Sequence, residues 1–299
     1  MPAEDTVPNS IYKSSEGEAE ILALYGEALA ALGSEHRSLT VGTRYGDTHV
    51  LAVGPDDAPP VLFLSGGNFF NPTCLRWFLR LTEQYLVYAP DLIGQPGRSA
   101  QTRLSPKGED HAQWAEDLLD GLGLQRVPVV GLSYGAGVAI RLMGHAPGRV
   151  SRTALVSPAG VASGRMSRML LEVALPMLAY RARPNRTRLL RAARPILSDL
   201  EDPIVRQLGA IYRNVRLDAS VPRMATEEEL RGFEGPVAVF APENDVFFPA
   251  GSVLPRAREI FPNLIRAECL RDCHHVPSNS ALTVVNGYIK VFFAGSDGG

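Results

Sequence analysis

The chain has 299 residues, a formal net charge of −2 at pH 7, 45% hydrophobic residues and 21% charged residues. This length suits one large domain, or a domain with an insertion, that buries a sizeable core. The near-neutral charge argues against nucleic acid as a partner, and the absence of an apolar run near the roughly 18 residues of a membrane span argues against a membrane partner.

The N-terminal part of the sequence predicts a helix followed by a hairpin. Residues 1–20 lack the basic start and apolar stretch of a signal peptide, so we expect a cytoplasmic protein. Apolar residues at helical spacing predict a helix over residues 17–32. The segment RSLTVGTRYGDTHVLAVG predicts two strands that turn at Gly46-Asp47.

Six later apolar runs predict the strands of a parallel sheet. They are PPVLFLSGG, YLVYAPDL, VPVVGLS, RTALVSPAG, GPVAVFAPEND and IRAECLRD. Their apolar residues are continuous rather than alternating, which indicates strands that are buried on both faces. Helical patterns separate or follow several of them: EDHAQWAEDLLDGLGL, GAGVAIRLMGHAP, LPRAREIF and NSALTVVNGYIKVFF. This alternation predicts an α/β fold with an antiparallel start.

One long stretch breaks this alternation, because residues 161–230 contain no convincing strand. Its pattern is helical, and we expect interruptions at Pro176, Pro184 and Pro195. We therefore predict a helical insertion over residues 161–230 between two core segments, residues 1–160 and 231–299. Near its end, Thr226 and Glu229 have the spacing of a helix-starting capping box.

The motif Gly131-Leu-Ser133-Tyr-Gly135 lies where a predicted strand meets a predicted helix. A serine hydroxyl becomes a useful nucleophile when a base removes its proton and hydrogen-bond donors hold the oxyanion formed on attack. A sharp strand-to-helix turn lifts such a serine clear of the sheet and leaves room only for small flanking residues. An ordinary glycine-rich turn with an incidental serine gives the same pattern, but the position between strand and helix favours a nucleophile.

A nucleophilic serine needs a base and an acid that orients the base, and in this architecture the acid comes first in the chain. Asp245 stands just past a predicted strand, and His274 and His275 follow the next strand. Singly, these would be turn, surface or core residues. Because functional groups gather at the carboxyl ends of parallel strands, we predict that Ser133, Asp245 and one of the two histidines form a catalytic triad.

The sequence resembles the α/β-hydrolase fold family over nearly its whole length. The matching motifs are LFLSGGN, DLIGQPGRS, GLSYGAG, VSPAG, APENDVFFP and CHHVP. A closer resemblance, to bacterial carboxylesterases related to naproxen esterase, rests on YGEALAAL, TRYGDTHVLAVGPDDAPPVLFLSGG and VSPAG. The resemblance implies the α/β-hydrolase fold, a mostly parallel sheet flanked by helices, with residues 161–230 as a helical lid.

The resemblance also implies roles for individual residues. The family histidine commonly stands in H-x-P, which favours His275 over His274. The expected oxyanion donors are the backbone N–H groups of Tyr134 and Gly67. Family members usually have His-Gly before the second donor, whereas this chain has Ser65-Gly66, and this difference puts the loop geometry in question. A serine at 133 argues against dehalogenase and epoxide-hydrolase chemistry, in which a carboxylate stands at this position.

These residues predict a serine hydrolase that cleaves small to medium-sized carboxylic esters through an acyl-enzyme, without a cofactor. We expect a small-molecule ester substrate and a monomer or homodimer. Fold and triad leave other reactions open, namely perhydrolysis and the hydrolysis of C–C or thioester bonds. A ligand-binding protein with vestigial hydrolase activity is a further alternative, since the Ser65-Gly66 sequence departs from the family pattern.

Three cysteines, Cys74, Cys269 and Cys273, give no disulfide framework and fit a reducing compartment. The last two lie near His274 and His275, which raises the possibility of a metal site. A structural zinc site normally pairs such a group with a second, distant pair of ligands. The sequence contains no second pair, so we predict no metal.

The predicted insertion is rich in long apolar side chains and arginines. The apolar residues could line an acyl or alcohol pocket or form the insertion's own packing seam, and we expect a mixture with few substrate contacts. We expect the arginines between residues 181 and 194 to form a solvated face, because arginine dominates the basic residues of the whole chain. The apolar residues are Met166, Met169, Leu170, Leu171, Leu175, Met177 and Leu178.

Overall fold

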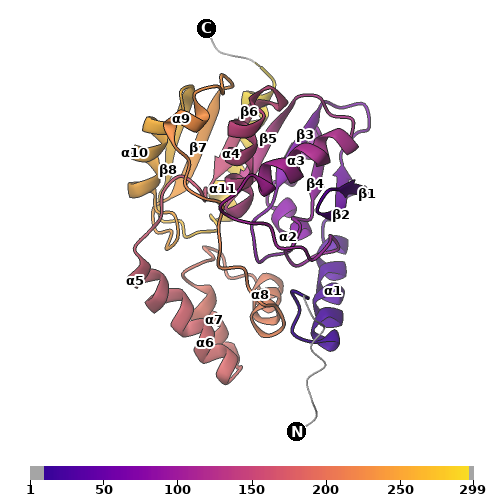
Figure 1. Ribbon diagram of the computed structural model, residues 1–299. Helices are drawn as coiled ribbons and strands as arrows, with labels where there is room; N and C mark the ends of the chain where they lie inside the picture. The colour runs from indigo at the N-terminus through magenta and orange to yellow at the C-terminus, as the bar shows by residue number, and fades with distance from the viewer. Residues whose placement is uncertain (1–9, 296–299) are drawn as a thin grey trace.

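The computed structural model describes residues 10–295, and its centre is one eight-stranded sheet in the order β1-β2-β4-β3-β5-β6-β7-β8 (Figure 1). β1 pairs with β2, and β2 with β4, in antiparallel fashion, whereas all later neighbours are parallel. The predicted fold class is confirmed. The strands are β1 (His36–Thr43), β2 (Gly46–Val53), β3 (Pro60–Leu64), β4 (Leu86–Pro90), β5 (Val127–Leu132), β6 (Val150–Val156), β7 (Val237–Pro242) and β8 (Leu264–Leu270).

Helices cover both faces of the sheet, because successive strand residues carry apolar side chains to opposite sides. In β5, Val129 packs in one core cluster with Trp114, whereas Val130 packs in another with Val285. The first face is covered by α3 (Asp110–Gly121), α4 (Tyr134–His145) and α10 (Ala250–Ile260). The second is covered by α2 (Asn71–Arg76), the 3-10 helix η1 (Leu79–Glu83) and α11 (Asn279–Phe293).

The predicted N-terminal hairpin forms, but the predicted position of its turn, Gly46-Asp47, is wrong. The turn consists of Arg44 and Tyr45, and Gly46 already pairs with Thr43 at the start of β2. The Thr43 hydroxyl donates to the Gly46 carbonyl and accepts from the Tyr45 N–H. These hydrogen bonds close the turn two residues before the predicted position. The carboxylate of Asp117 also receives hydrogen bonds from the backbone and side chain of Arg44.

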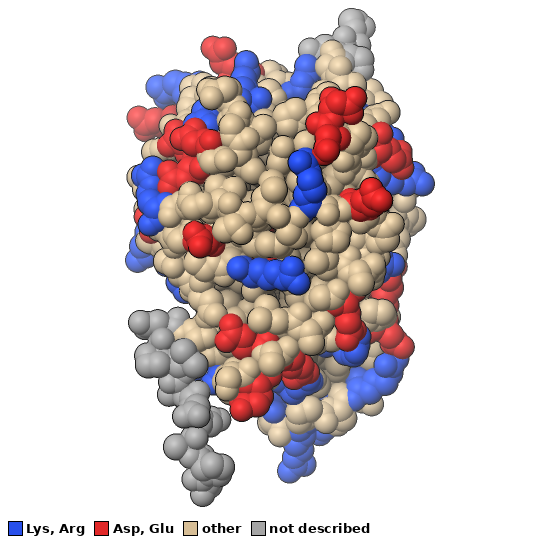
Figure 2. Space-filling view, turned by 90° about the vertical axis from the view of Figure 1, so that its right-hand side faces the viewer, with Lys and Arg blue, Asp and Glu red and all other residues tan. Residues whose placement is uncertain are grey.

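The first helix, α1 (Ser15–Ala30), begins and ends two residues before the predicted helix. Its start is fixed by Ser14, whose hydroxyl accepts a hydrogen bond from the Gly17 N–H. α1 contacts α8 (Asp202–Asn214), and Arg213 on α8 forms an ion pair with Glu20 at 2.6 Å. Acidic and basic side chains are interspersed on the face that carries α1 and the hairpin (Figure 2).

Residues between β6 and β7 form helices and loops. Residues 166–214 lie beyond one end of the sheet (Figure 1), whereas residues 227–230 pack beside α4 and α10. Pro184 and Pro195 lie past helix ends as expected, but Pro176 does not interrupt its helix. A π-helical turn, in which the Leu175 N–H bonds the Leu170 carbonyl, precedes the proline and accommodates a residue without an N–H. The helices are α5 (Met166–Met169), the π turn η3 (Leu170–Ala174), α6 (Leu175–Ala182), α7 (Arg186–Ala193), α8 and α9 (Glu227–Leu230).

The capping box predicted at the start of α9 is confirmed. The Thr226 hydroxyl accepts from the Glu229 N–H, and the Glu229 carboxylate accepts from the Thr226 N–H. The same carboxylate pairs with Arg141 of α4 at 3.0 Å and with Arg223. The Glu229 carboxylate therefore connects α9 to α4 of the core.

None of the helices within residues 10–295 is long and apolar enough to cross a lipid bilayer. The expectation that residues 1–20 are not a signal peptide falls partly outside the described residues, which begin at residue 10.

Candidate active site

Ser133 occupies the sharp turn between β5 and α4. Its backbone angles are φ 52° and ψ −114°, a strained region for a residue with a side chain. The turn is possible because glycines flank it: a Cβ at Gly131 would lie 2.5 Å from the Ala136 Cα, and one at Gly135 would lie 2.2 Å from the Leu64 carbonyl oxygen. The flanking glycines thus permit the turn that presents the serine hydroxyl at the carboxyl end of the sheet.

The structure brings the three predicted side chains together, with His275 rather than His274 as the histidine. His275 Nε2 lies 2.8 Å from Ser133 Oγ, and its Nδ1 lies 2.8 Å from Asp245 Oδ2. The other carboxylate oxygen of Asp245 accepts a 2.7 Å hydrogen bond from the Phe247 N–H. A carboxylate that accepts the Nδ1 proton leaves Nε2 free to accept the serine proton.

The loop that carries His275 is held from two directions. Ser157, directly after β6, donates its hydroxyl to the His275 carbonyl at 2.7 Å. On the other side, the Val276 N–H donates to the Ile196 carbonyl at 2.7 Å, and the His274 N–H donates to the Ser198 hydroxyl at 2.8 Å. Sequence reasoning missed these supports, and the only signal for Ser157 was the VSPAG motif.

Two phenylalanine rings cover the imidazole. The Phe247 ring meets the His275 ring edge-on at a centroid distance of 4.9 Å, and the Phe248 ring lies at 5.7 Å. The Asp245 side chain is fully buried. These contacts restrict rotation of the imidazole and exclude water from the hydrogen bond that orients it, which strengthens the electrostatic interaction.

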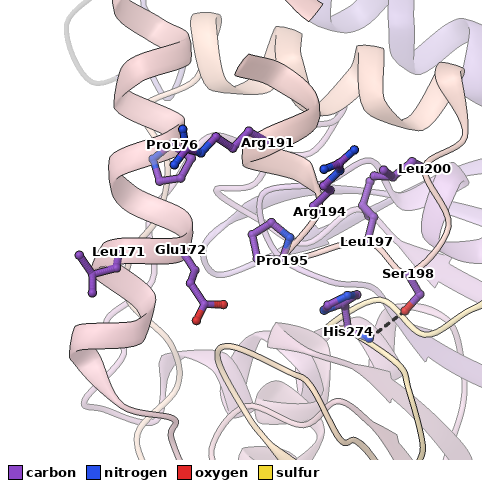
Figure 3. Close-up of a pocket in the computed structure, with 10 residues that line it drawn as sticks. All are labelled: Leu171, Glu172, Pro176, Arg191, Arg194, Pro195, Leu197, Ser198, Leu200 and His274. Carbon is purple, nitrogen blue, oxygen red and sulfur yellow. Dashed lines mark hydrogen bonds between the residues drawn. The ribbon is translucent and has the colours of Figure 1, made fainter. Parts of the chain in front are cut away.

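His274 faces a different space from its neighbour. Its side chain lines a cavity of about 460 Å³ between the helical stretch and the core, and its backbone N–H bonds Ser198 (Figure 3). Its buried Nδ1 has no hydrogen-bond partner within the described residues. Other residues that line this cavity include Leu171, Arg191 and Arg194.

We expected a mixture of pocket lining and packing seam for the long apolar side chains of the insertion, but the helix from Met166 to Ala182 buries few of them. Its large aliphatic side chains point mainly to solvent, with exposed fractions between 48% and 76%. Met169 and Met177 are half-buried, and Met177 packs against the second core cluster. The exposed residues are Met166, Leu170, Leu171, Leu175 and Leu178.

The loop that carries Gly67 lies against the serine turn. A Cβ at Gly66 would lie 3.8 Å from the Ser133 Cβ, and one at Gly67 would lie 3.1 Å from the Tyr134 Cβ. The Gly135 N–H donates to the Ser65 carbonyl at 3.0 Å and joins the two loops. Within residues 10–295 neither the Gly67 N–H nor the Tyr134 N–H has a hydrogen-bond partner, so both are available to an oxyanion.

The Tyr134 side chain is not part of the predicted oxyanion site, because it packs in the core. Its hydroxyl lies 2.7 Å from Nε2 of buried His111. Burial raises the pKa of Tyr134 and lowers the pKa of His111, so both side chains are neutral at neutral pH. This hydrogen bond anchors the first turn of α4, whose backbone supplies one of the predicted donors.

The cysteines and neighbouring histidines do not assemble into a ligand set. Cys269 is exposed, and Cys273 is buried with its sulfur 3.8 Å from the Ser278 hydroxyl. Among the residues that the structure describes, no group of three or more His, Cys, Asp or Glu side chains could hold a metal ion. Cys74 is enclosed in the core, where burial raises its pKa to about 12.

Comparison with known proteins identifies relatives along nearly the whole chain. The family model described as "Alpha/beta hydrolase family" matches residues 61–286. A Bacillus subtilis protein named "Uncharacterized carboxylesterase nap" is 28% identical over 97% of this chain and 97% of its own length. The carboxylesterase YbfK of the same organism is 27% identical over 91% of this chain and 92% of its own length.

Solved structures agree with the sequence relatives. Naproxen esterase from Bacillus subtilis superposes with a TM-score of 0.78 at 26% identity, covering 93% of this chain and 99% of its own. Carboxylesterase CesB (YbfK) from the same organism gives a TM-score of 0.79 at 25% identity, covering 94% of this chain and 99% of its own. The predicted resemblance to bacterial carboxylesterases related to naproxen esterase is therefore confirmed.

Proposed function

Because the chain belongs to the alpha/beta hydrolase family, we propose that it is a serine carboxylesterase that cleaves small to medium-sized carboxylic esters. The observation that carries this proposal is the continuous hydrogen-bond chain from Ser133 through His275 to Asp245. The carboxylesterase relatives support ester cleavage over the alternative reactions. The completeness of the hydrogen-bond chain supports an enzyme rather than a binding protein with vestigial activity.

In the proposed mechanism, His275 Nε2 removes the proton from Ser133 Oγ as the oxygen attacks the ester carbonyl carbon. Asp245 holds the Nδ1–H tautomer and stabilises the imidazolium that forms. The N–H groups of Gly67 and Tyr134 bind the tetrahedral oxyanion, and the N-terminal end of α4 adds favourable electrostatic potential.

The tetrahedral intermediate then collapses as the C–O bond to the alcohol breaks. The imidazolium gives its proton to the departing alkoxide, and the acyl group remains on Ser133. Water enters, His275 takes one of its protons, and the resulting hydroxide attacks the acyl carbon. A second tetrahedral species releases the carboxylic acid and returns the proton to Ser133.

Residues 161–230 serve in this proposal as a cap over a core made of residues 1–160 and 231–299. The substrate is a small-molecule ester, and the mechanism needs no cofactor, nucleic acid or membrane. We place the enzyme in the cytoplasm, as a monomer or homodimer. The three free cysteines support a reducing compartment.

Hydrolysis of p-nitrophenyl acetate and p-nitrophenyl butyrate tests the proposal. The wild-type protein should hydrolyse both, and Ser133→Ala should lose several orders of magnitude in kcat, because removing a triad member has this effect in related chemistry. Equal rates for the two proteins would contradict the proposed function.

A further inference from the structure

Asn68 links the predicted oxyanion loop to a distant part of the chain. It follows Gly67 directly and has φ 52°. Its side-chain amide makes two hydrogen bonds with the backbone of Asp218, donating to the carbonyl at 2.7 Å and accepting from the N–H at 2.8 Å. Asp218 lies between α8 and α9. The segment that joins these two helices therefore makes direct hydrogen bonds with the loop beside the serine.

Gln95 closes this link into a ring. Its buried side-chain oxygen accepts the Asn68 N–H at 2.7 Å, and its amide nitrogen donates to the Asp218 carboxylate at 3.2 Å. The acceptor and donor roles of the Gln95 amide are therefore both assigned by its neighbours. Arg103 holds the same Asp218 carboxylate by an ion pair at 3.3 Å.

The ring determines which N–H the oxyanion can use. Because the Asn68 N–H is occupied by Gln95, the Gly67 N–H remains as the donor of this loop. Two consecutive glycines, Gly66 and Gly67, give the loop backbone freedom that other residues lack. Hydrogen-bond donors stabilise a transition state most when they are fixed in place before the reaction, so this loop needs an external support.

We propose that Asn68 and Gln95 are positioning residues that clamp the oxyanion loop to Asp218. The inference rests on the proposed function. It adds that the oxyanion site is complete only while Asp218 keeps its hydrogen bonds with Asn68 and Gln95. Neither side chain is assigned a contact with the reacting atoms. Their effect is on where the Gly67 N–H points.

Gln95→Met, which keeps the length of the side chain and removes its hydrogen bonds, is the first test. Loss of this support should lower kcat for p-nitrophenyl butyrate about 10- to 100-fold, since small displacements at a reaction centre have effects of this size. KM should change far less. The control is Asn263→Ala, which removes a hydrogen bond from an exposed asparagine to the Glu234 carbonyl and should leave kcat unchanged.

An alkyl trifluoromethyl ketone, which forms an oxyanion on a nucleophilic serine, provides a second readout. Its inhibition constant should rise in Gln95→Met by the same factor by which kcat/KM falls. Lost packing alone would lower the thermal midpoint without this parallel change.

A charge-exchange pair provides the rescue test, and it also decides the matter if Gln95→Met does not fold. Gln95→Glu keeps the acceptor for Asn68 but faces the Asp218 carboxylate, so kcat should fall. In Gln95→Glu/Asp218→Asn the new amide donates to the new carboxylate, and most of kcat should return.

Unchanged kcat and inhibitor affinity in Gln95→Met, or no recovery in the double variant, would overturn the clamp. An inactive wild type would instead contradict the proposed function itself.

Discussion

His275 and Asp245 are joined by a 2.8 Å hydrogen bond between Nδ1 and Oδ2, with the carboxylate fully buried and the imidazole side chain only 11% exposed. Because the same imidazole also reaches Ser133 Oγ through Nε2, the buried acid determines which nitrogen is free to act as a base. The proposed catalysis therefore depends on the hydrogen bond between His275 and Asp245, which lies apart from the substrate.

Replacing Asp245 by asparagine tests this dependence. The asparagine amide would donate to Nδ1 and leave the proton on Nε2, so the imidazole could no longer accept the serine proton. We expect kcat to fall by about 10⁴, the effect of the equivalent change in serine proteases. Steady-state hydrolysis of p-nitrophenyl butyrate measures it. Asp202→Asn, at an exposed ion pair with Arg186, is the control, and comparable kcat values for the two variants would contradict the assignment.

The neighbouring histidines provide an internally matched pair. His275→Ala should lose several orders of magnitude in kcat, because the proposed base is removed. His274→Ala should stay within about one order of magnitude of wild type, because its backbone N–H still bonds Ser198 and its ring lines a separate cavity. Kinetics with p-nitrophenyl acetate compares them, and the reverse ranking would show that the other imidazole is the base.

Tyr134→Phe distinguishes the backbone of this residue from its side chain. The variant keeps the N–H that is proposed as an oxyanion donor and loses the hydroxyl contact with His111. We expect kcat/KM to stay within about threefold of wild type, and chemical denaturation to show a stability loss of about 1 kcal/mol for the missing hydrogen bond. A collapse of kcat with unchanged stability would instead assign the hydroxyl a direct role.

Glu229 should make stability depend on pH in the acid range. Partial burial works to raise its pKa, but hydrogen bonds from Arg141, the Thr226 backbone and Arg223 outweigh this and lower the pKa from 4.5 to about 2. A depressed pKa contributes stability above pH 4.5 that is lost as the pH falls towards 2.

Glu229→Gln should therefore lower the free energy of unfolding at neutral pH by about 1–2 kcal/mol, after allowance for solvent screening of the partly exposed pairs. The difference from wild type should shrink below pH 4 and vanish near pH 2. Urea denaturation across this range measures it, with exposed Glu228→Gln as the control. A difference that is independent of pH would contradict the ion-pair explanation.

The strands of the sheet could be predicted because burial on both faces leaves a continuous apolar signature, as in Val127–Leu132. The serine turn was equally readable, since Gly131 and Gly135 are required there by close backbone contacts. The order of acid and histidine along the chain then indicated Asp245 and either His274 or His275, and the H-x-P pattern of the family favoured His275.

Features that depend on contacts between distant residues could not be predicted. The hairpin turn at Arg44 is fixed in part by Asp117, and the bonds between Asn68 and Asp218 join residues 150 positions apart. Neither has a local sequence pattern. The continuation of the helix through Pro176 depends on a π turn, which hydrophobic periodicity does not reveal.

Reaction with a fluorophosphonate, followed by mass spectrometry of the intact protein and its peptides, tests whether His275 activates Ser133 as a nucleophile. We expect one covalent adduct on Ser133, formed rapidly in wild type, much more slowly in His275→Ala, and at the wild-type rate in His274→Ala. An unmodified Ser133 in active wild-type protein, or equal labelling rates in wild type and His275→Ala, would contradict it.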